Sequence, residues 1–144
     1  MKKIARGFTL IELIAVTILV GILSVALFSR IESAGSAAIQ SSRDGVIAAL
    51  FFAQQQAMMR NNITVVVTAN SISVNESGTP LLVSNGYYPL AMPNGISLAP
   101  ATTLTYDRLG RISAATTISL TGTGSNSGVS ASIRVEASGY AYAN

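Results

Sequence analysis

The fold of this chain is decided at residues 7–13, which read GFTLIEL and open an apolar run that ends at Phe28. From Phe8 the run holds 21 residues, and a helix of that length spans about 31 Å, close to the hydrocarbon core of a bilayer. Glu12 is its one formal charge. Because a carboxylate near the centre of a membrane helix costs about 2.5–3.5 kcal/mol, Glu12 requires a partner that its own segment does not supply.

The basic residues are unevenly distributed along the chain. Three of the nine, Lys2, Lys3 and Arg6, precede the apolar run, and the other six are balanced by six acidic residues. Basic residues in this position hold the adjacent end of a membrane helix in the cytoplasm. The remainder is formally neutral, so no basic surface for nucleic acid is expected.

Composition also restricts the chemistry of the chain. Its 144 residues include no Cys and no His, which excludes a Cys nucleophile, a His base and a Cys/His metal site. The sequence contains no phosphate-binding loop either. We therefore expect no catalytic residues, no cofactor and no metal.

We expect the helix to continue over residues 29–62 as an amphipathic segment. Apolar residues recur there at about helical spacing: Ile31, Ala34, Ala38, Val46, Leu50, Ala53 and Ala57. Two poor helix formers, Asn61 and Asn62, predict where it ends. Without a covering sheet, the last part of the helix would expose large apolar residues to water: Leu50, Phe51, Phe52, Met58 and Met59.

From residue 63 onward the pattern is that of β-strands. Alternating and β-branched runs predict strands at residues 63–68, 72–74, 81–84, 102–106, 116–120, 130–137 and 139–142. Gly, Pro and Asn predict irregular segments at residues 76–80, 85–100, 107–110 and 122–128. The expected fold class is α+β, a long N-terminal helix packed on an antiparallel β-sheet.

Residues 7–12, followed by the apolar helix, resemble the prepilin cleavage motif of type IV pilins and type II secretion pseudopilins. The resemblance implies a type IV pilin-like fold in four segments. These are a leader peptide over residues 1–7, a transmembrane and filament-core helix over 8–28, the amphipathic continuation over 29–62, and a globular antiparallel domain over 63–144.

The same resemblance implies how the N-terminus is processed. In that family a membrane-embedded prepilin peptidase cuts after the residue matched by Gly7 and methylates the new N-terminus, matched by Phe8. The family's glutamate at the place of Glu12 pairs with the amine of a neighbouring subunit. Gly7 and Phe8 are thus the implied cleavage residues, and Phe8 and Glu12 the implied assembly residues.

Partners and location follow from the resemblance as well. The implied partners are other pilin or pseudopilin subunits, the prepilin peptidase and an inner-membrane assembly platform. The implied location is the inner membrane, with one pass and a periplasmic globular domain, before assembly into a pilus or pseudopilus. Nucleic acid is not an expected partner.

A second stretch resembles a narrower group. Residues 104–111, which read LTYDRLGR, and the Gly139–Tyr140 pair resemble the minor pilins that include GspH, FimT and MshC. Within that group the DRLGR segment is most similar to MshC of the mannose-sensitive haemagglutinin pilus. The resemblance implies a minor pilin or pseudopilin, a structural subunit and not an enzyme.

Two alternatives of other classes remain open. A pilus-associated DNA-uptake receptor would carry basic residues near its C-terminus, where residues 139–142 have none. A secreted soluble binding domain would result if the apolar run were an ordinary signal peptide cut after Ala26. That cut would discard a helix whose pattern continues, and it would leave Glu12 unexplained.

The remaining polar and aromatic clusters have ordinary structural interpretations. The charges at residues 107–111 are typical of a solvated turn. Two tyrosine pairs, at 87–88 and at Tyr140 and Tyr142, are typical of half-buried sheet positions or loop anchors. Charged neighbours at 30–32 and 43–44 are expected on the helix surface, although contacts between subunits are the alternative.

Overall fold

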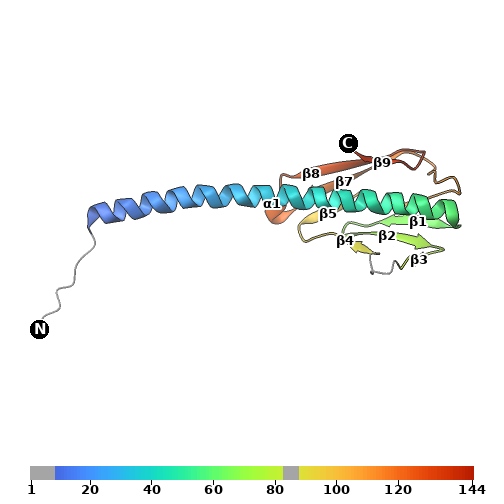
Figure 1. Ribbon diagram of the computed structural model, residues 1–144, viewed down its shortest axis with the longest axis horizontal. Helices are drawn as coiled ribbons and strands as arrows, with labels where there is room; N and C mark the ends of the chain where they lie inside the picture. The colour runs from blue at the N-terminus through green and yellow to red at the C-terminus, as the bar shows by residue number, and fades with distance from the viewer. Residues whose placement is uncertain (1–8, 83–87) are drawn as a thin grey trace, which may run out of the picture. The chain divides into compact units, whose positions relative to one another are not determined.

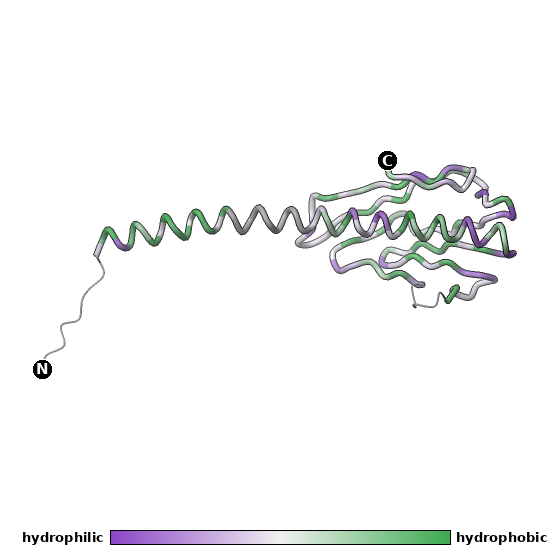
Figure 2. The backbone as a smooth tube through the Cα atoms, in the orientation of Figure 1, coloured by the Kyte–Doolittle hydropathy of each residue, from purple (hydrophilic) through white to green (hydrophobic). Residues whose placement is uncertain are grey.

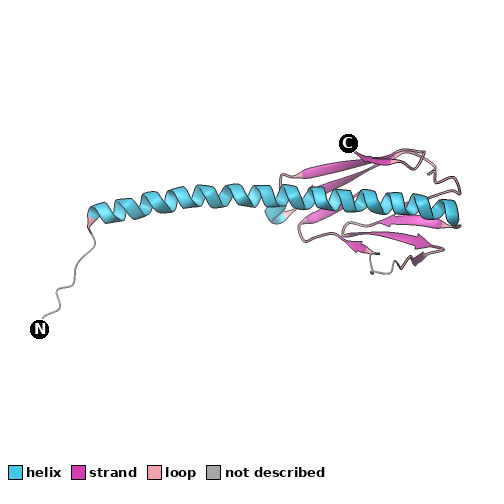
Figure 3. Cartoon of the chain, in the orientation of Figure 1, coloured by secondary structure: helices cyan, strands magenta, loops and turns pink. Residues whose placement is uncertain are grey.

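The computed structural model describes residues 9–82 and 88–144, and for residues 26–34 it describes the backbone alone. The chain divides into two compact units, Met1–Ala34 and Gly35–Asn144. Helix α1, Leu10–Met59, contributes to both units. The strands that follow it all belong to the second unit (Figure 3).

The strands of the second unit form two antiparallel sheets. The first has the order β3-β2-β1-β6, with β4 also paired to β2. Its strands are β1 (Ile63–Val67), β2 (Ser71–Glu76), β3 (Thr79–Pro80), β4 (Leu90–Ala91) and β6 (Thr102–Thr105). The second has the order β5-β7-β8-β9. Its strands are β5 (Ile96–Ala99), β7 (Thr116–Gly122), β8 (Ser130–Val135) and β9 (Ala141–Ala143), with the short 3₁₀-helix η1 (Gly124–Asn126) between β7 and β8.

One hydrophobic core joins the two sheets and the second part of α1. On the helix, the fully or nearly fully buried apolar residues lie on one face, at about helical spacing: Ile39, Val46, Ala49, Leu50, Ala53 and Ala57. In β1 and β2 the buried residues alternate, as expected when one face of a sheet packs on the core. Figure 1 shows β7, β8 and β9 above this part of α1, and β1, β2 and β3 below it.

The amphipathic face predicted for α1 is confirmed where the structure describes it. Val46, Leu50, Ala53 and Ala57 are buried, whereas Ala38 is half-buried and its neighbour Ile39 lies in the core. The side chains of the other two predicted positions, 31 and 34, lie outside the described residues.

The observed helix end lies two to three residues before the predicted one at Asn61–Asn62. α1 ends at Met59, and Asn62 has a φ of 58°. Asn enters this left-handed region more readily than most residues, since its short polar side chain bonds locally. The chain can therefore turn sharply from α1 into β1 at this point.

The strand predictions succeeded for β1, β2, β6, β7, β8 and β9 and failed between Glu76 and Pro100. Residues 76–80 and 85–100 were expected to be irregular but contain β3, β4 and β5. The strand expected at 81–84 is absent at 81–82, and the remaining two residues lie outside the described chain. β3 tolerates Pro80 because it lies at a sheet edge, where no ladder partner needs the missing N–H.

The expectation that a sheet covers every large apolar residue of the helix is wrong for three of them. Leu50 is fully buried and Phe52 half-buried, but Phe51, Met58 and Met59 are exposed. They lie off the buried stripe, since the core contacts only one side of α1.

Candidate assembly site

Helix α1 begins with a side-chain cap at Thr9. The backbone N–H of Glu12 donates to the Thr9 hydroxyl at 3.3 Å and to the Thr9 carbonyl at 3.1 Å. Thr followed three residues later by Glu is a helix-starting pattern known as a capping box. A carboxylate in the first turn is also favoured by the helix dipole, by about 0.3–1 kcal/mol. The capping role of Thr9 was not predicted from the sequence, although its spacing of three residues from Glu12 is the signal for it.

The first part of α1 presents an apolar surface on all its described sides. Large apolar side chains with more than two fifths of their surface exposed recur along it: Leu10, Ile11, Leu13, Ile14, Val16, Ile18, Leu19, Val20, Ile22, Leu23 and Val25. Figure 2 shows this stretch coloured mostly as hydrophobic. A helix that is apolar all round is stable when lipid or other apolar helices surround it.

The hydroxyl groups in this stretch do not interrupt that surface. Thr17 donates to the carbonyl of Ile14 at 2.9 Å, and Ser24 donates to the carbonyl of Val20 at 2.8 Å. Such bonds satisfy the hydroxyls within the helix itself. Among residues 10–25, only Glu12 then has a side-chain polar group, its carboxylate, that requires a partner outside the helix.

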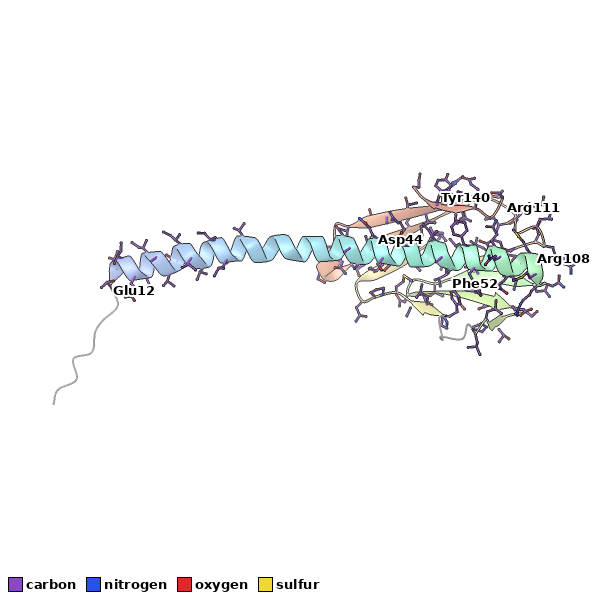
Figure 4. The ribbon with its side chains drawn as sticks, in the orientation of Figure 1. Glu12, Asp44, Phe52, Arg108, Arg111 and Tyr140 are labelled. Atoms are coloured by element: carbon purple, nitrogen blue, oxygen red, sulfur yellow. The ribbon has the colours of Figure 1, made fainter. Side chains whose placement is uncertain are left out.

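The structure describes only part of the predicted processing site. Glu12 is exposed in the first turn of α1 (Figure 4). Gly7 and Phe8 lie outside the described residues. No helical stretch that the structure describes is both long and apolar enough to cross a membrane.

The predicted turn at residues 107–110 is confirmed and is organised by Asp107. Its carboxylate accepts the backbone N–H groups of Leu109 and Arg111 at 2.8 and 2.9 Å, and it pairs with the Arg111 guanidinium at 2.8 Å. These hydrogen bonds to Arg111 hold the pKa of Asp107 below its usual value. Arg108 donates to the side chain of Asn61 at 2.7 Å. The charged side chains of this turn therefore pair with neighbouring groups of the same chain.

The tyrosines anchor strands and loops against α1. Tyr88 stacks on Phe52 with ring centres 5.4 Å apart, and Tyr140 and Phe51 form an edge-to-face pair with ring centres 5.7 Å apart. Tyr142 stacks on Tyr140 and donates to Glu136 at 3.0 Å. Tyr87 lies outside the described residues.

The charged pairs predicted on the helix surface are described in one case. Arg43 and Asp44 pair with each other at 2.9 Å on the surface of α1. The side chains at 30–32 lie outside the described residues.

Known proteins resemble this chain in its N-terminal sequence and in its fold. Residues 2–28 match the family model of the prokaryotic N-terminal methylation motif. The fold is similar to the crystal structure of the type IV minor pilin FimU of Pseudomonas aeruginosa, with a TM-score of 0.51 and 16% sequence identity. The similarity covers 73% of this chain and 91% of that one. No curated protein sequence matches the chain.

The chain thus combines a methylation motif at its N-terminus with the fold of a type IV minor pilin. The first is a sequence motif over residues 2–28, and the second is a likeness of fold built around a long N-terminal helix.

Proposed function

We propose that this chain is a minor pilin or pseudopilin, a structural subunit of a type IV pilus or of a type II secretion pseudopilus. The observation that carries the proposal is the first part of α1, whose exposed surface is apolar apart from Glu12. The methylation motif at residues 2–28 and the minor-pilin fold support the same assignment. The resemblance of residues 104–111 to the GspH, FimT and MshC group favours a minor subunit over a major one.

In this proposal the prepilin peptidase cuts after Gly7 and methylates Phe8. Before the cut, residues 8–28 hold the subunit in the inner membrane with residues 63–144 in the periplasm. The cut creates an ammonium group at Phe8, in a segment that has no basic side chain of its own. An assembly platform in the inner membrane then transfers the helix from lipid to the filament.

Glu12 then directs the register of assembly. The ammonium of one subunit and the carboxylate of the next neutralise each other in an apolar surrounding. Removing one member of such a buried pair leaves the other uncompensated and costs about 3–5 kcal/mol. A subunit without this carboxylate therefore competes poorly for a place in the filament.

The mature N-terminus tests the processing step. Mass spectrometry of the membrane form should find a chain that starts at Phe8 and carries one methyl group. A chain that starts at Leu27 would instead support the secreted-domain alternative.

A substitution tests the assembly step. Glu12→Ala should be cleaved normally, because Gly7 and Phe8 are unchanged, yet its recovery in sheared filaments should fall by at least about tenfold, given the cost of an unpaired buried charge. Thr17→Ala is the matched control, since its hydroxyl bonds only within the helix. Equal incorporation of the two variants would refute the pairing of Glu12.

A further inference from the structure

Two adjacent methionines at the end of α1 are exposed to solvent. Met58 is 56% exposed and Met59 is 70% exposed. Met92 is half-buried and packs against the hydrophobic core. A thioether that solvent reaches is also reached by small oxidants, which convert methionine to its sulfoxide. Among the methionines that the structure describes, Met58 and Met59 are therefore the most open to oxidation.

Met58 also takes part in a contact between α1 and the turn at residues 107–110. A Cβ added to Gly110 would lie 2.7 Å from the Cε methyl of Met58, which is the nearest side-chain atom to that point. The methyl group therefore rests directly on Gly110. None of the three nearest atoms belongs to Met59. The two methionines thus share their exposure but differ in what they hold.

Gln54 supplies the polar half of the same contact. It lies four residues before Met58, so the two side chains are neighbours on one face of the helix. The Gln54 amide donates to the carbonyls of Gly110 and Ser138. The turn is therefore attached to α1 by an apolar contact from Met58 and a hydrogen bond from Gln54, side by side.

Peroxide can oxidise the Met58 sulfur in a simple two-electron step. A sulfur lone pair attacks one oxygen of hydrogen peroxide, so that an S–O bond forms and the O–O bond breaks. The sulfur is oxidised to the sulfoxide, and the peroxide is reduced to water. The product is polar where the thioether was apolar, and methionine sulfoxide reductases reverse the change.

The sulfoxide weakens both halves of the contact. Its oxygen is a hydrogen-bond acceptor beside the Gln54 amide, and it competes there with the carbonyl of Gly110. Because it also prefers water, it draws the Met58 side chain away from Gly110. The turn keeps its own shape, since the bonds of Asp107 to Leu109 and Arg111 are made within residues 107–111.

We infer that Met58 is a peroxide-sensitive modification site, whose oxidation releases the turn at residues 107–110 from α1. The inference does not depend on the proposed function, because all the residues that carry it lie in the second unit. Met59 is oxidised as well, but its oxidation leaves the turn in place.

Peroxide treatment of the full chain in detergent tests the site. Peptide mass spectrometry identifies which methionines have gained one oxygen, and thermal unfolding is measured before and after treatment. The Tm of the second unit should fall by at least about 3 °C. Treatment with methionine sulfoxide reductases should restore it. A Met58 that stays unmodified while Met59 is oxidised would overturn the inference.

Two leucine variants separate the adjacent methionines. Leu replaces Met with little change of volume, so both variants should fold. Peroxide should leave the Tm of Met58→Leu unchanged, whereas Met59→Leu should lose as much as wild type. Equal losses in the two variants would show that Met58 is not the sensitive residue.

Tryptic cleavage after Arg108 reports directly on the turn. Cleavage of a folded chain follows the population of its open form, so a released turn should be cut faster. In the oxidised wild type and in oxidised Met59→Leu, cleavage after Arg108 should accelerate at least about fivefold. In oxidised Met58→Leu it should not change. A lower Tm without faster cleavage would contradict the release of the turn.

Discussion

At the scale of single residues, Tyr106 is the least satisfied group in the described chain. Its side chain is 4% exposed, and its hydroxyl is buried without a hydrogen-bond partner. Burial raises the pKa of Tyr106 to about 12. The ring contributes to the core beside β6, whereas the hydroxyl loses its hydration on folding.

Replacing Tyr106 by Phe should stabilise the second unit. The substitution keeps the ring and removes a polar group whose burial costs about 1–3 kcal/mol when it is unpaired. We expect the free energy of unfolding to rise by about 1 kcal/mol in urea titrations. Tyr106→Leu is the control, because it removes the hydroxyl but also the ring, and it should destabilise. A Tyr106→Phe variant less stable than wild type would show that the hydroxyl has a partner.

The raised pKa of Tyr106 also predicts a loss of stability at high pH. The ordinary tyrosine pKa is 10.0, and the folded value is about 12. As the pH rises, the unfolded chain therefore loses this proton before the folded chain does. The free energy of unfolding is unaffected by the ionisation of Tyr106 below pH 10 and declines as the pH rises to about 12. The loss should reach about 2–3 kcal/mol. Denaturant titrations of wild type and Tyr106→Phe should diverge in this interval, with wild type losing the additional stability, and parallel curves would contradict the shift.

At the scale of elements, three segments meet at Gln54 on α1. Its amide donates to the carbonyl of Gly110 at 3.2 Å and to the carbonyl of Ser138 at 3.0 Å. Gly139 has a φ of +84°, and a side chain there would collide with the carbonyl of Gly110. The 107–110 turn and the turn before β9 are thus held against each other and against the helix.

This packing predicts a large effect for Gly139→Ala. Gly78 is a matched control, since it has a φ of +85° but no atom within 4 Å of the place that a Cβ would occupy. Gly78→Ala should cost about 1–2 kcal/mol, the usual penalty of this conformation. Gly139→Ala should cost about 2–4 kcal/mol, because a steric collision adds to it. Equal changes in thermal unfolding would show that the turns separate easily.

The elements also show what could be predicted from the sequence. α1, β1 and β8 carry long periodic or β-branched patterns, and these were predicted correctly. β5 holds only four residues between two prolines, so local composition outweighed its pattern. Pairing with β7 makes it a strand, and that contact lies about twenty positions or more away in sequence.

The candidate sites also differ in whether a local sequence pattern is enough to predict them. Glu12 could be found from sequence because a single charge in an apolar run is a local signal. The contact between Phe52 and Tyr88 could not, since the two residues are far apart in sequence and only tertiary packing brings their rings together. Phe51, Met58 and Met59 were expected under a sheet because periodicity does not give the width of the buried face.

At the scale of the whole molecule, the core belongs entirely to the second unit. All buried core residues lie between Ile39 and Ala141. In the first unit, by contrast, the described apolar side chains are exposed. The two units therefore need different surroundings, water for one and apolar partners for the other.

This division predicts that residues 35–144 fold without the first unit. The shortened chain should be monomeric and should unfold cooperatively, because it retains every core residue. Sedimentation and circular dichroism during thermal unfolding check both properties. A chain that aggregates or melts gradually would show that residues before Gly35 contribute to the core.

The way α1 continues into β1 has a mechanical consequence. Buried residues from Ile39 to Ala57 contact a core shared by both sheets, and only three residues separate Met59 from Ile63. A pulling force that enters along the helix axis must slide this whole row of side chains at once before the link to β1 bears load. The second unit should therefore resist tension along its helix better than tension that peels β9 from the sheet edge one bond at a time.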